Sequence, residues 1–157
     1  MSLRIPYQVT GEIKVSLRRL IPEQKIAGEK AIKACAEDLL KSSKELVPVD
    51  TGTLRDNGRV EKDGDLHYSV IYDVTVADRL KARGKGTNGI SEPYFKYGWL
   101  QHENLKYHHY IGQALFLEEP FEENKDRYIR EIGQALKNSI KRGKWNISAK
   151  WSRRGRQ

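Results

Sequence analysis

The stretch VPVDTGTLRD contains Asp50-Thr51-Gly52, the triplet with which aspartic proteases present a catalytic carboxylate. In those enzymes two aspartates share one proton and so provide both an acid and a base, each held in a rigid turn. Here the triplet follows a predicted helix and a proline, and the sequence holds no second Asp-Thr-Gly. A dyad would therefore need two copies of the chain, and we interpret the triplet as a structural turn.

Each residue of the expected turn has a predicted structural role. Asp50 is expected to bond backbone groups ahead of it, and Gly52 is expected to take a positive φ angle. Thr53 is expected to cap a short helical turn that runs through Leu54. The residues assigned to this structural turn are Pro48, Asp50, Thr51, Gly52, Leu54 and Arg55.

The segment QHENLKYHH places several potential metal ligands within eight residues, a combination that can also serve a nuclease. These ligands are His102, Glu103, His108 and His109. The spacing HExxH is absent, and adjacent histidines on a loop tend to point apart. We expect these side chains to form hydrogen bonds at the surface or at an interface, without a metal or any other cofactor.

Two further patterns have plain interpretations. Cys35 is the only cysteine, which excludes an intrachain disulfide and a cysteine-based zinc site, and its place in AIKACAEDLL favours a small buried helix residue. The glycines of ARGKGTNG lack the Gly-Lys-Ser/Thr ending of a phosphate-binding loop, so we expect a flexible loop. These residue patterns favour no catalytic site.

Positive charge is concentrated at the C-terminal end of the chain. The net charge is +8, and residues 141–157 hold seven Lys or Arg and no acid, together with Trp145 and Trp151. Such a tail can stack on nucleotides or anchor on a protein partner, and the sequence leaves both open. The predicted contacts to DNA or to an acidic partner are Lys81, Arg83, Lys85, Lys144, Lys150, Arg153, Arg154 and Arg156.

Two segments have helical periodicity. The first runs from Glu23 to about Leu46 and is ended by Pro48, because the residue before a proline is pushed out of helical geometry. The second runs from about Glu119 to Lys141, with acids near its start and an apolar stripe along it. We predict that these two helices pack on a sheet.

Alternating residues predict the strands of that sheet. They are expected in EIKVSL, at 58–62, at 66–76 and, as an aromatic strand, at Tyr94–Gln101. Asp63-Gly64 predicts a two-residue hairpin turn, and 79–93 is expected to be a long loop. The prediction is an α+β fold with a small antiparallel sheet, in which 1–141 is one domain and 142–157 a basic extension. No apolar run approaches the roughly 20 residues of a membrane span and no signal peptide opens the chain, so we expect folding in a reducing cytoplasm.

Taken together, three stretches resemble a known family. They are LVPVDTGTLRD after the long helix, YGWLQHEN, and GQALFLEEPFEENKDRYIREI. They are similar to the minor capsid, or head–tail joining (tail-completion, neck), proteins of long-tailed double-stranded DNA phages. The resemblance covers roughly residues 11–141, and it implies that the Asp-Thr-Gly turn is structural.

The resemblance implies a structural virion protein of the neck that is not an enzyme, assembled in the bacterial host cytoplasm. Such proteins form a homo-oligomeric ring, on the order of six or twelve copies, between the portal or head-completion protein and the tail tube or terminator protein. DNA passes through the ring, so contact with packaged DNA is expected. The residues predicted to contact neighbouring subunits or partners are Tyr97, Trp99, Gln101, His102, Phe116, Leu117, Trp145 and Trp151.

Two alternatives to this role make different predictions. A basic nucleic-acid-binding protein outside the virion would lose DNA affinity steeply with salt, and on removal of residues 141–157. An enzyme would lose activity on Asp50→Asn or His102→Ala with its fold intact.

Overall fold

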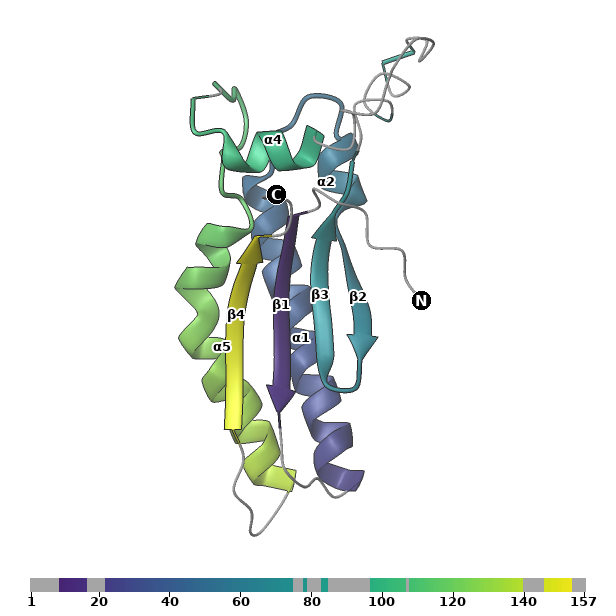
Figure 1. Ribbon diagram of the computed structural model, residues 1–157, viewed down its shortest axis with the longest axis vertical. Helices are drawn as coiled ribbons and strands as arrows, with labels where there is room; N and C mark the ends of the chain where they lie inside the picture. The colour runs from purple at the N-terminus through teal and green to yellow at the C-terminus, as the bar shows by residue number, and fades with distance from the viewer. Residues whose placement is uncertain are drawn as a thin grey trace.

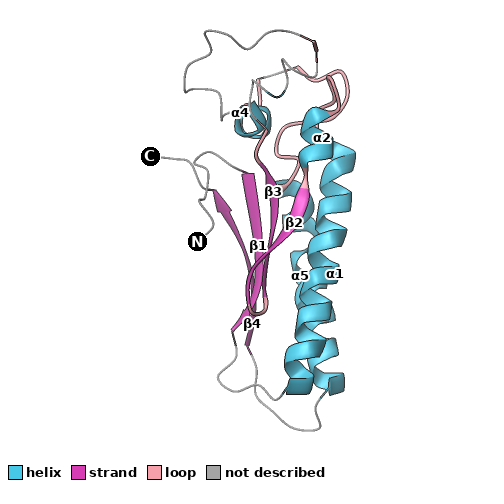
Figure 2. Cartoon of the chain, turned by 90° about the vertical axis from the view of Figure 1, so that its right-hand side faces the viewer, coloured by secondary structure: helices cyan, strands magenta, loops and turns pink. Residues whose placement is uncertain are grey.

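The computed structural model describes residues 9–16, 22–74, 78, 83–84, 97–106, 108–139 and 146–153, with the backbone alone for 15–16 and 146–153. Two long helices lie on one face of a four-stranded antiparallel sheet of order β2-β3-β1-β4 (Figures 1 and 2). This arrangement confirms the predicted α+β class. The elements in chain order are β1 (Val9–Ser16), α1 (Pro22–Leu46), α2 (Thr53–Asn57), β2 (Arg59–Gly64), β3 (His67–Tyr72), α4 (Tyr97–Glu103), α5 (Glu118–Ser139) and β4 (Asn146–Arg153).

Both long helices are confirmed, and each buries one stripe of side chains. The α1 stripe recurs every three or four residues and consists of Gln24, Gly28, Ile32, Cys35, Ala36, Leu39 and Ser43. The α5 stripe includes Phe121, Tyr128, Ile132 and Leu136, all fully buried. Burying a side chain of this size is worth about 1.5–3 kcal/mol, so the stripes fix how the helices face the sheet.

The sheet contributes the other half of the core. Val9 pairs with Tyr72 and Ile13 with Tyr68 across β1 and β3, so these four side chains share one face, and all four are buried. The Tyr72 hydroxyl lies 2.7 Å from the Ser43 hydroxyl and so joins the sheet to α1. Burial raises the pKa of Tyr72 to about 12, which keeps the hydroxyl neutral in the core.

The hairpin between β2 and β3 forms, but its turn lies two residues beyond the predicted Asp63-Gly64. Gly64 still pairs with His67, so Asp65 and Leu66 make the turn, and the register shifts between Lys62 and Gly64. Leu66 is buried at a positive φ of 54°. Its backbone N–H donates to a Glu29 carboxylate oxygen at 2.6 Å. This contact with α1 overrides the local turn preference of Asp-Gly.

The predicted aromatic strand at Tyr94–Gln101 is wrong where the structure describes it. Residues 97–103 form the helix α4, and 94–96 lie outside the described residues. Gly98 and His102 are the buried residues of α4, one helical turn apart. A side chain on Gly98 would start 3.2 Å from Leu54 of α2, so the glycine allows close packing of the two short helices.

Part of the predicted basic extension belongs to the sheet. Residues 146–153 form β4, which pairs with β1 along its whole length, from Val9 opposite Arg153 to Ser16 opposite Asn146. The segment is therefore ordered on its own chain. None of the helices that the structure describes is long and apolar enough to cross a membrane.

Candidate assembly surface

The Asp-Thr-Gly turn reverses the chain between α1 and α2. Gly52 has a φ of 84°, which confirms the expected positive value, and its carbonyl accepts the Asp56 N–H at 2.9 Å. The cap differs from the expectation. Gly52 itself occupies the cap position of α2 without a side-chain cap, and the Thr51 hydroxyl accepts the Thr53 N–H at 3.4 Å. Thr51 therefore supplies the hydroxyl that was assigned to Thr53.

Asp50 lies on the surface next to this turn. Its carboxylate forms an ion pair with Arg83, one of the predicted DNA contacts, and both side chains are about one-third exposed. A protease dyad needs a carboxylate that shares a proton with another carboxylate in a rigid site. Asp50 lies at the surface in an ion pair with a guanidinium, which is not the setting of such a dyad and favours a structural role.

The two most distinctive sequence stretches, VPVDTG and GQALFL, are joined by backbone hydrogen bonds. The Val49 N–H donates to the Ile111 carbonyl at 3.1 Å, and the Gln113 N–H donates to the Leu46 carbonyl at 2.8 Å. Between them, Gly112 has a φ of 88° and lies so close that an added Cβ would be 2.5 Å from the Pro48 nitrogen. This contact fixes the end of α1 against the segment that leads into α5.

His102, Phe116 and Leu117 were predicted at an interface, but all three side chains are fully buried. The His102 ring packs edge-on against Phe116 at 4.9 Å. Its Nε2 accepts the Glu118 N–H at 3.4 Å, so Nδ1 carries the proton and donates to Glu103 at 3.0 Å. The prediction is corrected: these three residues belong to the core, and His102 bridges α4 and the start of α5.

The other predicted contact residues fall into three groups. Tyr97, Trp99 and Gln101 on α4 are partly exposed, and their place at an interface stays a prediction. On β4, Lys150 lies opposite Glu12, Trp151 opposite Gly11 and Arg153 opposite Val9. The positions outside the described residues are Lys81, Lys85, Lys144, Trp145, Arg154 and Arg156.

The described residues of loop 105–111, which are 105–106 and 108–111, expose apolar side chains that the sequence reasoning did not single out. Leu105 is 72% exposed, Tyr110 95% and Ile111 57%. The loop joins α4 to α5 and includes the predicted ligands His108 and His109. Burial, with His108 as a second cause, lowers the pKa of His109 and favours its neutral form. No group of three or more His, Cys, Asp or Glu in the described part of the chain could hold a metal ion.

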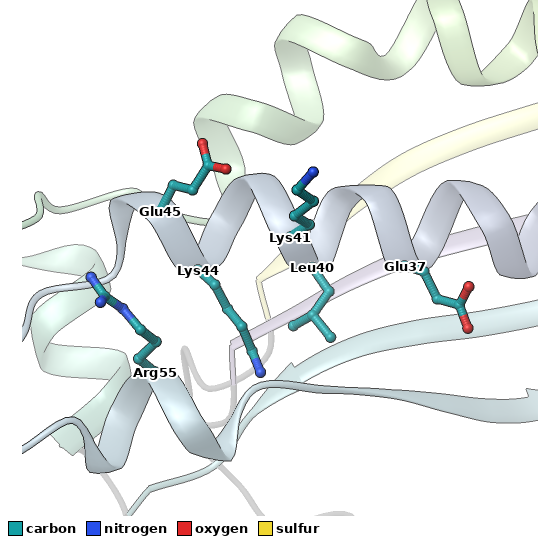
Figure 3. Close-up of a pocket in the computed structure, with 6 residues that line it drawn as sticks. All are labelled: Glu37, Leu40, Lys41, Lys44, Glu45 and Arg55. Carbon is teal, nitrogen blue, oxygen red and sulfur yellow. The ribbon is translucent and has the colours of Figure 1, made fainter.

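A groove between α1 and α2 was also missed (Figure 3). It is lined by Glu37, Leu40, Lys41, Lys44, Glu45 and Arg55. In the close-up, Leu40 and Lys44 extend from the side of α1 that faces β2, whereas Lys41 and Glu45 extend from the opposite side. The signal in the sequence was Leu40, an apolar residue outside the main α1 stripe and four residues before Lys44.

One protein-family model matches the chain, over residues 12–92, just over half of its length. Its description is "Bacteriophage HK97-gp10, putative tail-component". The match contains most of β1, all of α1, the Asp-Thr-Gly turn and the β2–β3 hairpin. No curated protein matches the chain, and no solved structure matches it either. With the helix, turn and hairpin matched in one stretch, the chain belongs to the HK97-gp10-like family of bacteriophage tail components.

Proposed function

We propose that the protein is a head–tail connector of the virion neck. Copies form a closed ring that joins the portal or head-completion protein to the tail tube or terminator protein. Membership of a phage tail-component family supports the structural role. The role requires binding surfaces and no catalytic group.

The observation that best supports a ring is the direction of the two sheet edges. The four strands alternate in direction, so the edge strands β2 and β4 are antiparallel to each other (Figure 1). Rotating a copy about an axis parallel to the strands keeps every strand direction. Such a rotation brings β2 of one copy antiparallel to β4 of the next, which is a geometry that hydrogen-bonds.

This head-to-tail contact uses two different surfaces and closes into a ring when the rotation divides a full turn. Among the described strands, none pairs with the outer edge of β2 or β4. Arg59, Glu61 and Lys62 place charges on β2, a common protection against non-specific edge pairing. The edge is therefore suited to one specific neighbour.

The copy number of the chain in purified particles tests the proposal. Quantitative mass spectrometry against the portal subunit should give a small fixed number, on the order of six or twelve, as closed rotational symmetry requires. Absence from mature particles would refute the connector role. Attention would then move to the nucleic-acid-binding alternative.

That alternative needs a variant that keeps the fold. Deleting residues 141–157 would also remove β4, so a loss of DNA affinity would be ambiguous. The double substitution Lys150→Gln and Arg153→Gln removes two charges and retains the strand residues. A nucleic-acid-binding protein would show DNA affinity that falls steeply with salt, with a shallower salt dependence in this variant.

A further inference from the structure

Two surface features lie at the same end of the molecule but on opposite lateral sides. The exposed loop 105–111 leads into α5, which packs beneath β4. The groove is formed by α1 and α2, and α2 leads directly into β2. Figure 1 shows α2 beside β2, with the loop on the side of α5, and Figure 2 shows α1 and α2 together on the β2 side.

The loop has the features of a segment that docks into a partner. Three large apolar side chains within seven residues are each more than half exposed. Such a concentration of exposed apolar side chains on one loop favours a contact with another molecule. Tyr110 extends furthest, since it is almost fully exposed, and its ring is stacked edge-on against His108 at 5.1 Å. An aromatic residue presented in this way is a typical anchor at protein interfaces.

The groove has the features of a binding site for such a tyrosine side chain. Leu40 provides an apolar floor, and the aliphatic stem of Lys44 extends along it (Figure 3). The Nε atom of Arg55 is buried without a hydrogen-bond partner among the described residues. Lysine and arginine also bind aromatic faces, so Lys44 and Arg55 suit a tyrosine ring and its hydroxyl.

We propose that loop 105–111 of one copy docks in the groove of the next copy, with Tyr110 against Leu40, Lys44 and Arg55. The inference rests on the ring of the proposed function, because that ring sets the β4 side of one copy beside the β2 side of its neighbour. Both features lie at the same end, so the rotation that pairs the strands also brings loop and groove together. In a closed ring every loop is covered and every groove is filled.

A double-cysteine variant tests this contact in infected-cell extracts. His108→Cys with Lys44→Cys keeps the Tyr110 anchor, since the His108 ring lies beside the Tyr110 ring. Treated with a short thiol-to-thiol cross-linker, this variant should give a ladder of covalent species that extends past the dimer. Native Cys35 is buried, and burial raises its pKa to about 12, so it remains unreactive and need not be removed. His108 is exposed and Lys44 partly exposed, so both substitutions leave the core intact.

The matched control is His108→Cys with Lys30→Cys. Lys30 is an exposed residue of the same helix, about 21 Å along α1 from Lys44. This pair should give no ladder. Monomers alone from the test pair would overturn the contact, and dimers alone would show a reciprocal pair and overturn the head-to-tail arrangement.

A second pair of variants separates packing from charge. Tyr110→Phe keeps the ring and should retain the oligomer in analytical ultracentrifugation. Tyr110→Lys removes the ring and brings a positive charge to Lys44 and Arg55, and it should shift the protein to monomers. Equal behaviour of the two variants would overturn the role of Tyr110.

The result is separable from the copy-number measurement. A ladder with no copies in mature particles would support the contact and refute the connector role. A fixed copy number without a ladder would support the connector role and overturn the contact.

Discussion

At the residue scale, two glycines near the Asp-Thr-Gly turn are required for different physical reasons. Gly52 is held at a positive φ with open space around it, and the nearest atom to an added Cβ would be 3.6 Å away. Gly112 combines a positive φ with direct backbone contact at Pro48. At Gly52 only the backbone conformation disfavours a side chain. At Gly112 there is also no room for a Cβ atom.

Alanine substitutions at the two positions should therefore lower the free energy of unfolding by different amounts. Gly52→Ala should lower the free energy of unfolding by about 1–2 kcal/mol, the cost of a left-handed backbone with a Cβ. Gly112→Ala should cost more, since the Cβ would displace the end of α1. Urea denaturation measures both, with Gly64→Ala as the control, because nothing lies within 4 Å of its Cβ position. Equal losses at positions 52 and 112 would contradict the packing argument.

His102 gives a second residue-scale prediction. Its replacement by alanine leaves a cavity and removes the acceptor of the Glu118 N–H, so the free energy of unfolding should fall by about 2–4 kcal/mol. Asp50→Asn, at an exposed ion pair, should cost less than about 1 kcal/mol. A nuclease or protease would show the opposite pattern, with activity lost and stability unchanged. Thermal denaturation of the two variants distinguishes these cases.

At the scale of elements, a polar clamp joins α2, β2 and the end of β3. Arg59 donates through both terminal nitrogens to the Asp73 carboxylate at 2.8 Å, and Asn57 Nδ2 donates to the same carboxylate at 2.8 Å. The Asp73 N–H donates back to the Asn57 side-chain oxygen at 2.8 Å. The Arg59 guanidinium holds the pKa of Asp73 below its usual value.

The clamp predicts a pH dependence. Because the pKa of Asp73 is lower in the folded protein than in the unfolded chain, its stabilisation is fully present above the unfolded value, about 3.9. The stabilisation is lost as pH falls through the folded value. Unfolding free energy measured from pH 6 to pH 2 should therefore fall less steeply in Asp73→Asn than in the wild type. Equal slopes of the unfolding free energy against pH in the two proteins would contradict the clamp.

The two long helices and the β2–β3 hairpin could be predicted from the sequence because their signals are local. Pro22 and Pro48 bracket α1, and alternation from Leu66 onward marks β3. The hairpin turn and α4 could not, since their conformations depend on distant partners. Leu66 is held by Glu29, and Gly98 lies against Leu54.

The groove and the burial of three predicted interface residues could not be predicted from the sequence. The groove needs Leu40 and Arg55, which come from different elements and meet only in the folded chain. His102, Phe116 and Leu117 were expected at a subunit or partner interface. Their burial follows from the Leu115 N–H, which donates to the His102 carbonyl at 2.8 Å and folds the loop back on α4.

At the scale of the whole molecule, β4 determines whether the C-terminal segment is dispensable. Its pairing with β1 spans eight residue pairs, so truncation after residue 141 would expose the β1 edge. We expect the truncated protein to lose cooperative unfolding or to aggregate, as measured by circular dichroism and light scattering. The Lys150→Gln and Arg153→Gln double variant should remain folded. A soluble, cooperatively folded truncation would contradict a structural role for β4.

The two ends of the long axis differ in construction. One end carries the Asp-Thr-Gly turn, α4 and the exposed loop, and the other carries the starts of α1 and β4 and the ends of α5 and β1 (Figure 1). In a ring whose axis follows the strands, all copies point the same way, so these ends become two chemically distinct rims. Such a ring has polarity, and only one of its rims presents α4 and the Asp-Thr-Gly turn. A partner that recognises that rim can bind from one side alone, which would make the joint between head and tail directional from the moment the ring closes.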